Sequence, residues 1–141
     1  MSLVSDSSFA DLFRSSLADL GLPADDSHRL SVPLPPSLPR SLKALYLVAG
    51  QHPINGMHHR LLLPNQLDRR GGKVIFAEEN QQTIVWAFDE SDGVDDPEVW
   101  QGQLAAGGLD EGIVWYSEEL PLSRFVVEMW TWTVTGESST S

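Results

Sequence analysis

Apolar residues change their spacing twice along this chain, and this change restricts the fold more than any other feature. From residue 9 to residue 49 they recur mostly at helical intervals, and they do so again after residue 122. Between residues 73 and 116 they fall instead into β-branched and aromatic runs, which are typical of strands. We therefore expect one α+β domain over residues 1–141, an antiparallel sheet of about four to six strands flanked by two N-terminal helices and one C-terminal helix.

Three stripes of apolar residues predict the helices. The first stripe, with Ser8 as its N-cap and Gly21 as its stop, consists of Phe9, Leu12, Phe13, Leu17 and Leu20. The second, which follows a proline-rich connector and ends at Gly50, consists of Leu38, Leu42, Leu45, Tyr46 and Ala49. The third consists of Leu122, Phe125, Val126, Met129, Trp130 and Thr133.

The strand-like runs predict a meander. Lys73–Ala77 and Thr83–Phe88 form a hairpin around a polar turn, and two short strands are expected at Glu98–Gln101 and Ile113–Tyr116. A Gly/Ala-rich loop separates those two strands. Residues 51–72 are expected to be mostly loop, with room for a short strand or helical turn around Leu61–Leu63.

The charge of the chain is concentrated in one segment. Residues 74–123 carry twelve carboxylates and no Lys or Arg, whereas residues 1–73 have a net charge of +2 and residues 124–141 a net charge of −1. Such a one-signed field selects partners and speeds encounters, so a basic protein partner is predicted. The alternative is a solvated acidic face that only keeps the protein in solution. Direct binding to nucleic acid is not expected, because phosphate contacts require Lys and Arg.

The acidic segment supplies the candidate docking residues. Its partner-binding set is predicted to be Glu78, Glu79, Asp89, Glu90, Asp92, Asp95, Asp96, Glu98 and Trp100. Trp100 lies beside the acids and is the predicted aromatic anchor. Trp132 lies off the stripe of the third helix, so it too is expected to be partly exposed.

Catalytic interpretations of the same acids are not supported. Glu78 and Glu79 are neighbours on a predicted strand and should point to opposite faces, so a shared substrate is not expected. A structural role is favoured instead, with Asn80 and Gln81 closing the turn. No nucleophile–base pair is visible elsewhere, and we predict a protein that is not an enzyme.

Metal and cofactor sites are not predicted either. If Gly93 were the glycine of an EF-hand loop, Phe88 and Val99 would occupy its first and twelfth ligand positions, where oxygen ligands are needed. His58 and His59 are adjacent, without the spacing that places two imidazoles on one helical face, and the chain has no cysteine. We therefore expect no metal and no cofactor.

The N-terminal residues predict no targeting signal. Met1–Ser8 has neither a basic nor an apolar region, and the longest apolar run, Ala44–Ala49, is far shorter than the roughly 20 residues of a membrane span. A cytoplasmic protein without a membrane-spanning segment is expected.

Several short segments resemble the SUKH superfamily, the domain shared by yeast cell-wall-assembly regulators and many bacterial immunity proteins. Their order and spacing carry the resemblance, and together they cover about residues 35–132. These segments are Pro35-Pro36-Ser37-Leu38, Leu45-Tyr46, Ala49-Gly50, Leu61–Leu67, Phe76–Gln81, Val85–Asp89, Asp96–Trp100 and Leu122–Phe125. The chain departs from the family pattern at Glu98 and Trp100, which bears on the identity of the partner more than on the fold.

The resemblance implies an α+β fold that binds proteins without catalysis. Bacterial proteins of this type commonly neutralise a cognate toxin, often a nuclease, by covering its active site, and a basic nuclease groove would suit the acidic segment. The alternative implied by the eukaryotic members is a regulatory scaffold that binds an endogenous cytoplasmic partner. Whether the protein is a monomer or a homodimer stays open.

Overall fold

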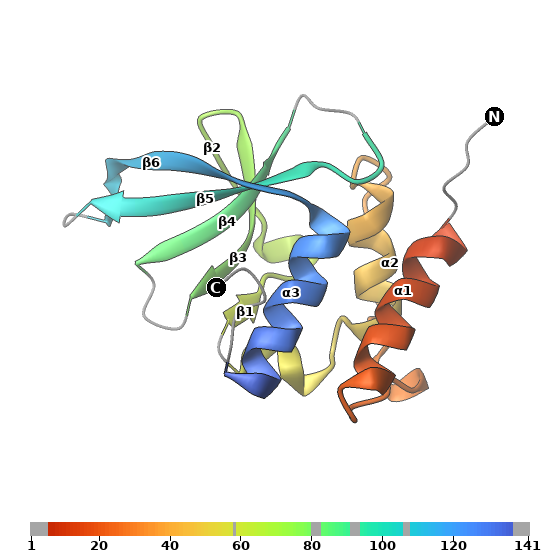
Figure 1. Ribbon diagram of the computed structural model, residues 1–141. Helices are drawn as coiled ribbons and strands as arrows, with labels where there is room; N and C mark the ends of the chain where they lie inside the picture. Colours follow the sequence, from red (N-terminus) through yellow and green to blue (C-terminus); the bar gives the residue numbers. More distant parts are fainter. Residues whose placement is uncertain (1–5, 58, 80–82, 91–93, 106–107, 137–141) are drawn as a thin grey trace.

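The computed structural model describes residues 6–57, 59–79, 83–90, 94–105 and 108–136. Within them the predicted α+β architecture is confirmed, because two N-terminal helices and one C-terminal helix accompany a six-stranded antiparallel sheet (Figure 1). The helices are α1 (Asp6–Asp19), α2 (Arg40–Ala49) and α3 (Leu122–Thr135). The strands are β1 (His59–Leu61), β2 (Asp68–Arg70), β3 (Lys73–Glu79), β4 (Ile84–Asp89), β5 (Glu98–Ala105) and β6 (Gly108–Pro121).

The sheet is a meander extended at one side. Its strands lie in the order β1-β3-β4-β5-β6, and β2 also pairs with β3, at the opposite end from β1. Residues 51–72, expected to be mostly loop, therefore supply two short strands, together with 3-10 turns at Pro53–Gly56 and Pro64–Gln66.

The three helices have the predicted faces, and α3 begins at Leu122, the first residue of its predicted stripe, but α1 and α2 begin at other residues than expected. Helix α1 begins at Asp6, so Ser8 lies inside the helix and the prediction that it is the N-cap was wrong. Helix α2 begins at Arg40 after Pro39, because an X–Pro bond disfavours helical geometry in the residue before it. It ends at Gly50, where an added Cβ would approach the Leu30 Cβ to 2.7 Å, so only glycine fits.

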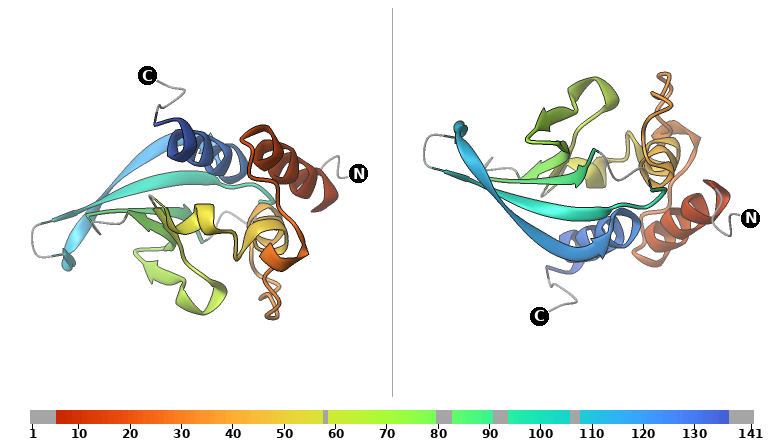
Figure 2. Two further views of the ribbon diagram at one scale, coloured as in Figure 1. Left: turned by 90° about the horizontal axis from the view of Figure 1, so that it is seen from below. Right: turned by 90° about the horizontal axis from the view of Figure 1, so that it is seen from above.

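The main core lies between the sheet and the helices (Figure 2). The sheet contributes Val74, Phe76, Trp86, Phe88 and Val99, all buried. Helix α3 packs on this face and α1 packs against α2 and α3. A smaller cluster on the opposite face contains Leu62, Ile75, Val85 and Ala87.

Strands β5 and β6 are longer than the sequence suggested. The Gly/Ala-rich stretch expected to be a loop is largely strand, because β5 pairs with β6 from Trp100 to Ala105. Gly102 lies under the indole of Trp115, and an added Cβ would come within 2.6 Å of that ring. Glycine is therefore required here by close packing rather than by a turn.

The long hairpin is irregular where it meets α3. The register shifts between Glu98 and Trp100, and opposite this point Glu119 adopts a left-handed backbone with φ of 60°. Bulges of this kind bend the strand and re-aim its side chains. Here the bulge turns β6 directly into Leu122, the first residue of α3.

None of the helices in the described ranges is both long enough and apolar enough to cross a lipid bilayer.

Candidate functional site

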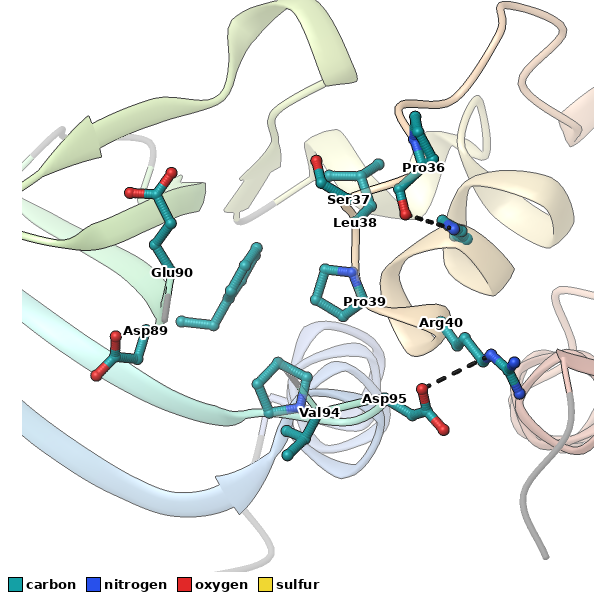
Figure 3. A pocket seen from close by; sticks show the side chains of 12 residues that line it. Pro36, Ser37, Leu38, Pro39, Arg40, Asp89, Glu90, Val94 and Asp95 are labelled. Carbon is teal, nitrogen blue, oxygen red and sulfur yellow. Dashed lines mark hydrogen bonds and ion pairs between the residues drawn. The ribbon is translucent and has the colours of Figure 1, made fainter. Parts of the chain in front are cut away.

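Part of the predicted docking set surrounds one pocket. This pocket, of about 350 Å³, lies between the end of β4 and the start of α2 (Figure 3). Asp89 and Glu90 lie on one side of it, and Arg40 and Asp95 lie on another. Asp92, which was predicted to belong to the same surface, lies outside the described residues.

Arginines from the first half of the chain pair with three of the predicted acids. Arg40 Nε lies 3.6 Å from Asp95 Oδ1, and Arg69 Nε lies 2.5 Å from Glu90 Oε1. A third pair joins an Arg60 guanidinium nitrogen to Glu78 Oε1 at 3.3 Å. Each pair cancels charge locally, so the outward field of the acidic segment is weaker than its sequence suggests.

Two further members of the predicted set have intramolecular partners. Asp96 accepts hydrogen bonds from the Ser123 backbone N–H (2.8 Å) and from the Ser123 hydroxyl (2.6 Å). These bonds satisfy a backbone donor in the first turn of α3, so Asp96 caps that helix from a different segment. Glu98 accepts a hydrogen bond from the hydroxyl of Ser117.

Trp100 lies on the face of the sheet away from the helices. It is half-buried, and the Nζ of Lys73 lies 4.5 Å from its ring centroid. The same ammonium lies 5.8 Å from the centroid of Trp115. Lys73 therefore covers this pair of rings by a cation–π contact within the chain.

A second hollow gathers a different group of carboxylates. This groove has a volume of about 540 Å³ and lies between α3 and the sheet. We call it the α3 groove. Its acidic residues are Glu79, Glu118, Glu119 and Glu128, and its aromatic rings are His59, Trp86, Phe125 and Trp132.

The rings form a continuous wall of the α3 groove. The imidazole of His59 has its centroid 4.9 Å from that of Trp86 and 5.2 Å from that of Trp132. Trp86 in turn lies 5.7 Å from Phe125. Trp86 and Phe125 are buried, whereas Trp132 is half-buried, as its position off the helix stripe predicted.

Two of the four carboxylates, Glu118 and Glu79, are positioned by uncharged donors. The Trp86 indole N–H donates to Glu118 Oε2 at 2.9 Å, and the Gln101 amide donates to the same oxygen at 3.2 Å. Glu79 accepts from the Thr83 hydroxyl, and Glu128 Oε2 is buried without a hydrogen-bond partner among the described residues. No Lys or Arg in the described residues forms an ion pair with any of these four acids.

Glu79 is the one predicted site residue in the α3 groove. Its neighbour Glu78 is engaged with Arg60, which agrees with the expectation that the two point in different directions. Sequence reasoning missed Glu118, Glu119 and Glu128. Glu118 and Glu119 lie in the acidic segment just before α3, and this position was the signal in the sequence that could have identified them.

Among the described residues, neither hollow is lined by a nucleophile held against a base, the arrangement that covalent catalysis would need. Over the described ranges, no three His, Asp or Glu side chains come together in a way that could hold a metal ion. The predicted turn residues Asn80 and Gln81, and also His58, lie outside those ranges.

His52 has a structural role. His52 is buried, its Nδ1 accepts from the Ile54 N–H at 3.1 Å, and its Nε2 lies 3.0 Å from the Leu22 carbonyl oxygen. Nε2 must therefore carry the proton. Burial lowers the pKa of His52, which favours this neutral form.

Comparison of the chain with models of protein families, with curated proteins and with solved structures finds no match. The resemblance to the SUKH superfamily therefore stays a prediction.

Proposed function

We propose that this protein is a non-enzymatic binding domain that recognises a basic protein, and that it acts as an immunity protein against a cognate toxin. The observation that carries the proposal is the α3 groove, where four carboxylates gather and no Lys or Arg of the described residues pairs with them. A partner's Lys and Arg residues would supply the missing charges. Occlusion is the mechanism, since a bound inhibitor excludes the toxin's substrate.

Electrostatics gives the encounter its rate and direction. The chain has a formal net charge of −11, so a cationic partner is attracted before contact. A nuclease suits this proposal, because a groove that holds phosphates must be basic. The same acidic groove repels nucleic acid, so the immunity protein does not bind the substrate of the nuclease that it inhibits.

The first experiment identifies the partner. The tagged protein is used to capture binding proteins from its native host, and mass spectrometry identifies them. The proposal expects a basic toxin, whose activity is inhibited in proportion to the complex formed. Capture of an endogenous housekeeping protein instead would favour the regulatory scaffold.

The second experiment locates the docking surface. One variant carries Glu79→Gln, Glu118→Gln and Glu119→Gln, and its matched control carries Glu78→Gln, Glu90→Gln and Asp95→Asn. Both remove three charges, but only the control acids are already paired. We expect the groove variant to slow association with the captured partner by about tenfold or more and to flatten its salt dependence.

An equal effect of the two variants would mean that only the total charge matters. A larger effect of the control would place docking on the acidic segment predicted from the sequence. Reversal of Asp92 and Asp95 to lysine tests that segment directly, because an unchanged association rate would exclude it as the docking surface. Asp96, the third acid of this stretch, is left unchanged because its carboxylate caps α3.

A further inference from the structure

We propose that the α3 groove receives the side chain of one arginine from the partner, with its guanidinium against the aromatic wall and its N–H groups on the carboxylates. This inference rests on the proposed function and names the chemical group that the groove recognises. The groove has a volume of about 540 Å³, which exceeds the volume of one side chain and lies within the range of typical ligand pockets.

The aromatic wall favours a flat cation. A guanidinium stacks on indole faces and is less strongly hydrated than an ammonium, so it loses less on leaving water. Trp132 is half-buried at the groove and can offer such a face. Trp86 is fixed by its hydrogen bond to Glu118, so the wall is formed before the ligand arrives.

The acids provide matching acceptors. Glu128 Oε2 is a buried acceptor that receives no hydrogen bond from the part of the chain that the structure describes, which is a costly state that a donor would relieve. Glu119 stands exposed at the rim, on the left-handed turn of the β6 bulge. A guanidinium carries five N–H donors in a planar fork and can serve two carboxylates at once.

A lysine ammonium would satisfy the charge but would fit the wall less well. It is a compact, strongly hydrated point charge with three donors and no flat face. The proposal therefore predicts discrimination between two peptides of equal charge, and simple electrostatic attraction predicts none.

The test uses hexa-arginine and hexa-lysine peptides as probes of the full-length protein. Affinity is measured by calorimetry at low salt, and the indole N–H signals of Trp86 and Trp132 are followed by NMR. We expect hexa-arginine to bind about threefold to thirtyfold more tightly and to shift both signals. Equal affinity of the two peptides, or shifts confined to other residues, would overturn the proposal.

Variants separate the groove from general charge. Glu118→Gln keeps an oxygen for the Trp86 indole and removes one charge, and Glu90→Gln removes one charge far from the groove. Trp132→Ala removes part of the wall. We expect Glu118→Gln and Trp132→Ala to weaken hexa-arginine binding by about threefold or more, and Glu90→Gln to change it less than twofold. Equal losses for Glu118→Gln and Glu90→Gln would reject the groove.

The two proposals fail in different ways. If Trp132→Ala and Glu118→Gln abolish the preference for hexa-arginine but leave capture of the basic partner intact, the arginine site is wrong as the docking point and the proposed function stands. If hexa-arginine binds as expected but the host contains no basic partner, the groove chemistry stands and the proposed function fails. Circular dichroism spectra of each variant confirm that the fold is retained.

Discussion

Replacing Asp96 by alanine should destabilise the protein although this residue lies in the acidic segment. Its carboxylate accepts two hydrogen bonds from Ser123, at 2.8 Å from the backbone nitrogen and 2.6 Å from the hydroxyl. Ser123 is buried, so water cannot replace both bonds. Loss of a helix cap costs about 0.5–2 kcal/mol, and hydrogen bonds to charged groups contribute about 1.5–3 kcal/mol each. Because these contributions overlap, we expect Asp96→Ala to lower the free energy of unfolding by about 2–3 kcal/mol.

Asp95→Ala is the matched control. The Asp95 side chain is 45% exposed and its carboxylate lies 3.6 Å from Arg40, an exposed pair that contributes about 0–1 kcal/mol. The Ser41 N–H donates to the backbone carbonyl of Asp95, and the substitution leaves this hydrogen bond in place. In urea unfolding, Asp96→Ala should lower the midpoint by about 1 M or more at an unchanged slope, and its Tm should fall by about 7–10 °C. Equal midpoints for the two variants would refute the helix-capping argument.

Three other predictions concern the core and the sheet. The pKa of His52 lies below its ordinary value of 6.5, so the unfolded chain takes up a proton before the folded chain does, and stability should fall as the pH drops below about 6.5. In urea unfolding at a series of pH values, His52→Gln should weaken this dependence. Gly102→Ala should cost about 1–3 kcal/mol and change the near-UV signal of Trp115, whose ring lies 2.6 Å from the added Cβ. Tyr46→Phe should cost about 1–2 kcal/mol by thermal unfolding, because it strands the Leu62 carbonyl that accepts the buried phenol at 2.5 Å.

The helices and the first hairpin could be predicted because each depends on local pattern. Phe13 and Leu17 lie on one face of a periodic stripe, and both are fully buried. The length of β5 and β6 could not be predicted in the same way. Their Gly-rich stretch has weak strand propensity, and it is held by pairing across the hairpin and by Trp115 packed over Gly102.

The candidate site was only partly predictable for a related reason. Sequence gives the amount of charge but not which acids meet the chain's own arginines. Arg60 and Glu78 are far apart in sequence and become neighbours only through the pairing of β1 with β3. Glu128 belongs to a helix that looked like core, and its place in the α3 groove depends on how α3 crosses the sheet.

The side chain of Trp86 belongs to both the main core and the α3 groove. Its ring packs in the main core against Phe125, and its edge holds Glu118 in the α3 groove. Divergence toward a new partner therefore cannot begin at Trp86 without endangering the folded state. Glu119 is exposed, so it can vary at less structural cost among residues that tolerate its left-handed backbone, and sequence drift among descendants of this protein should concentrate there.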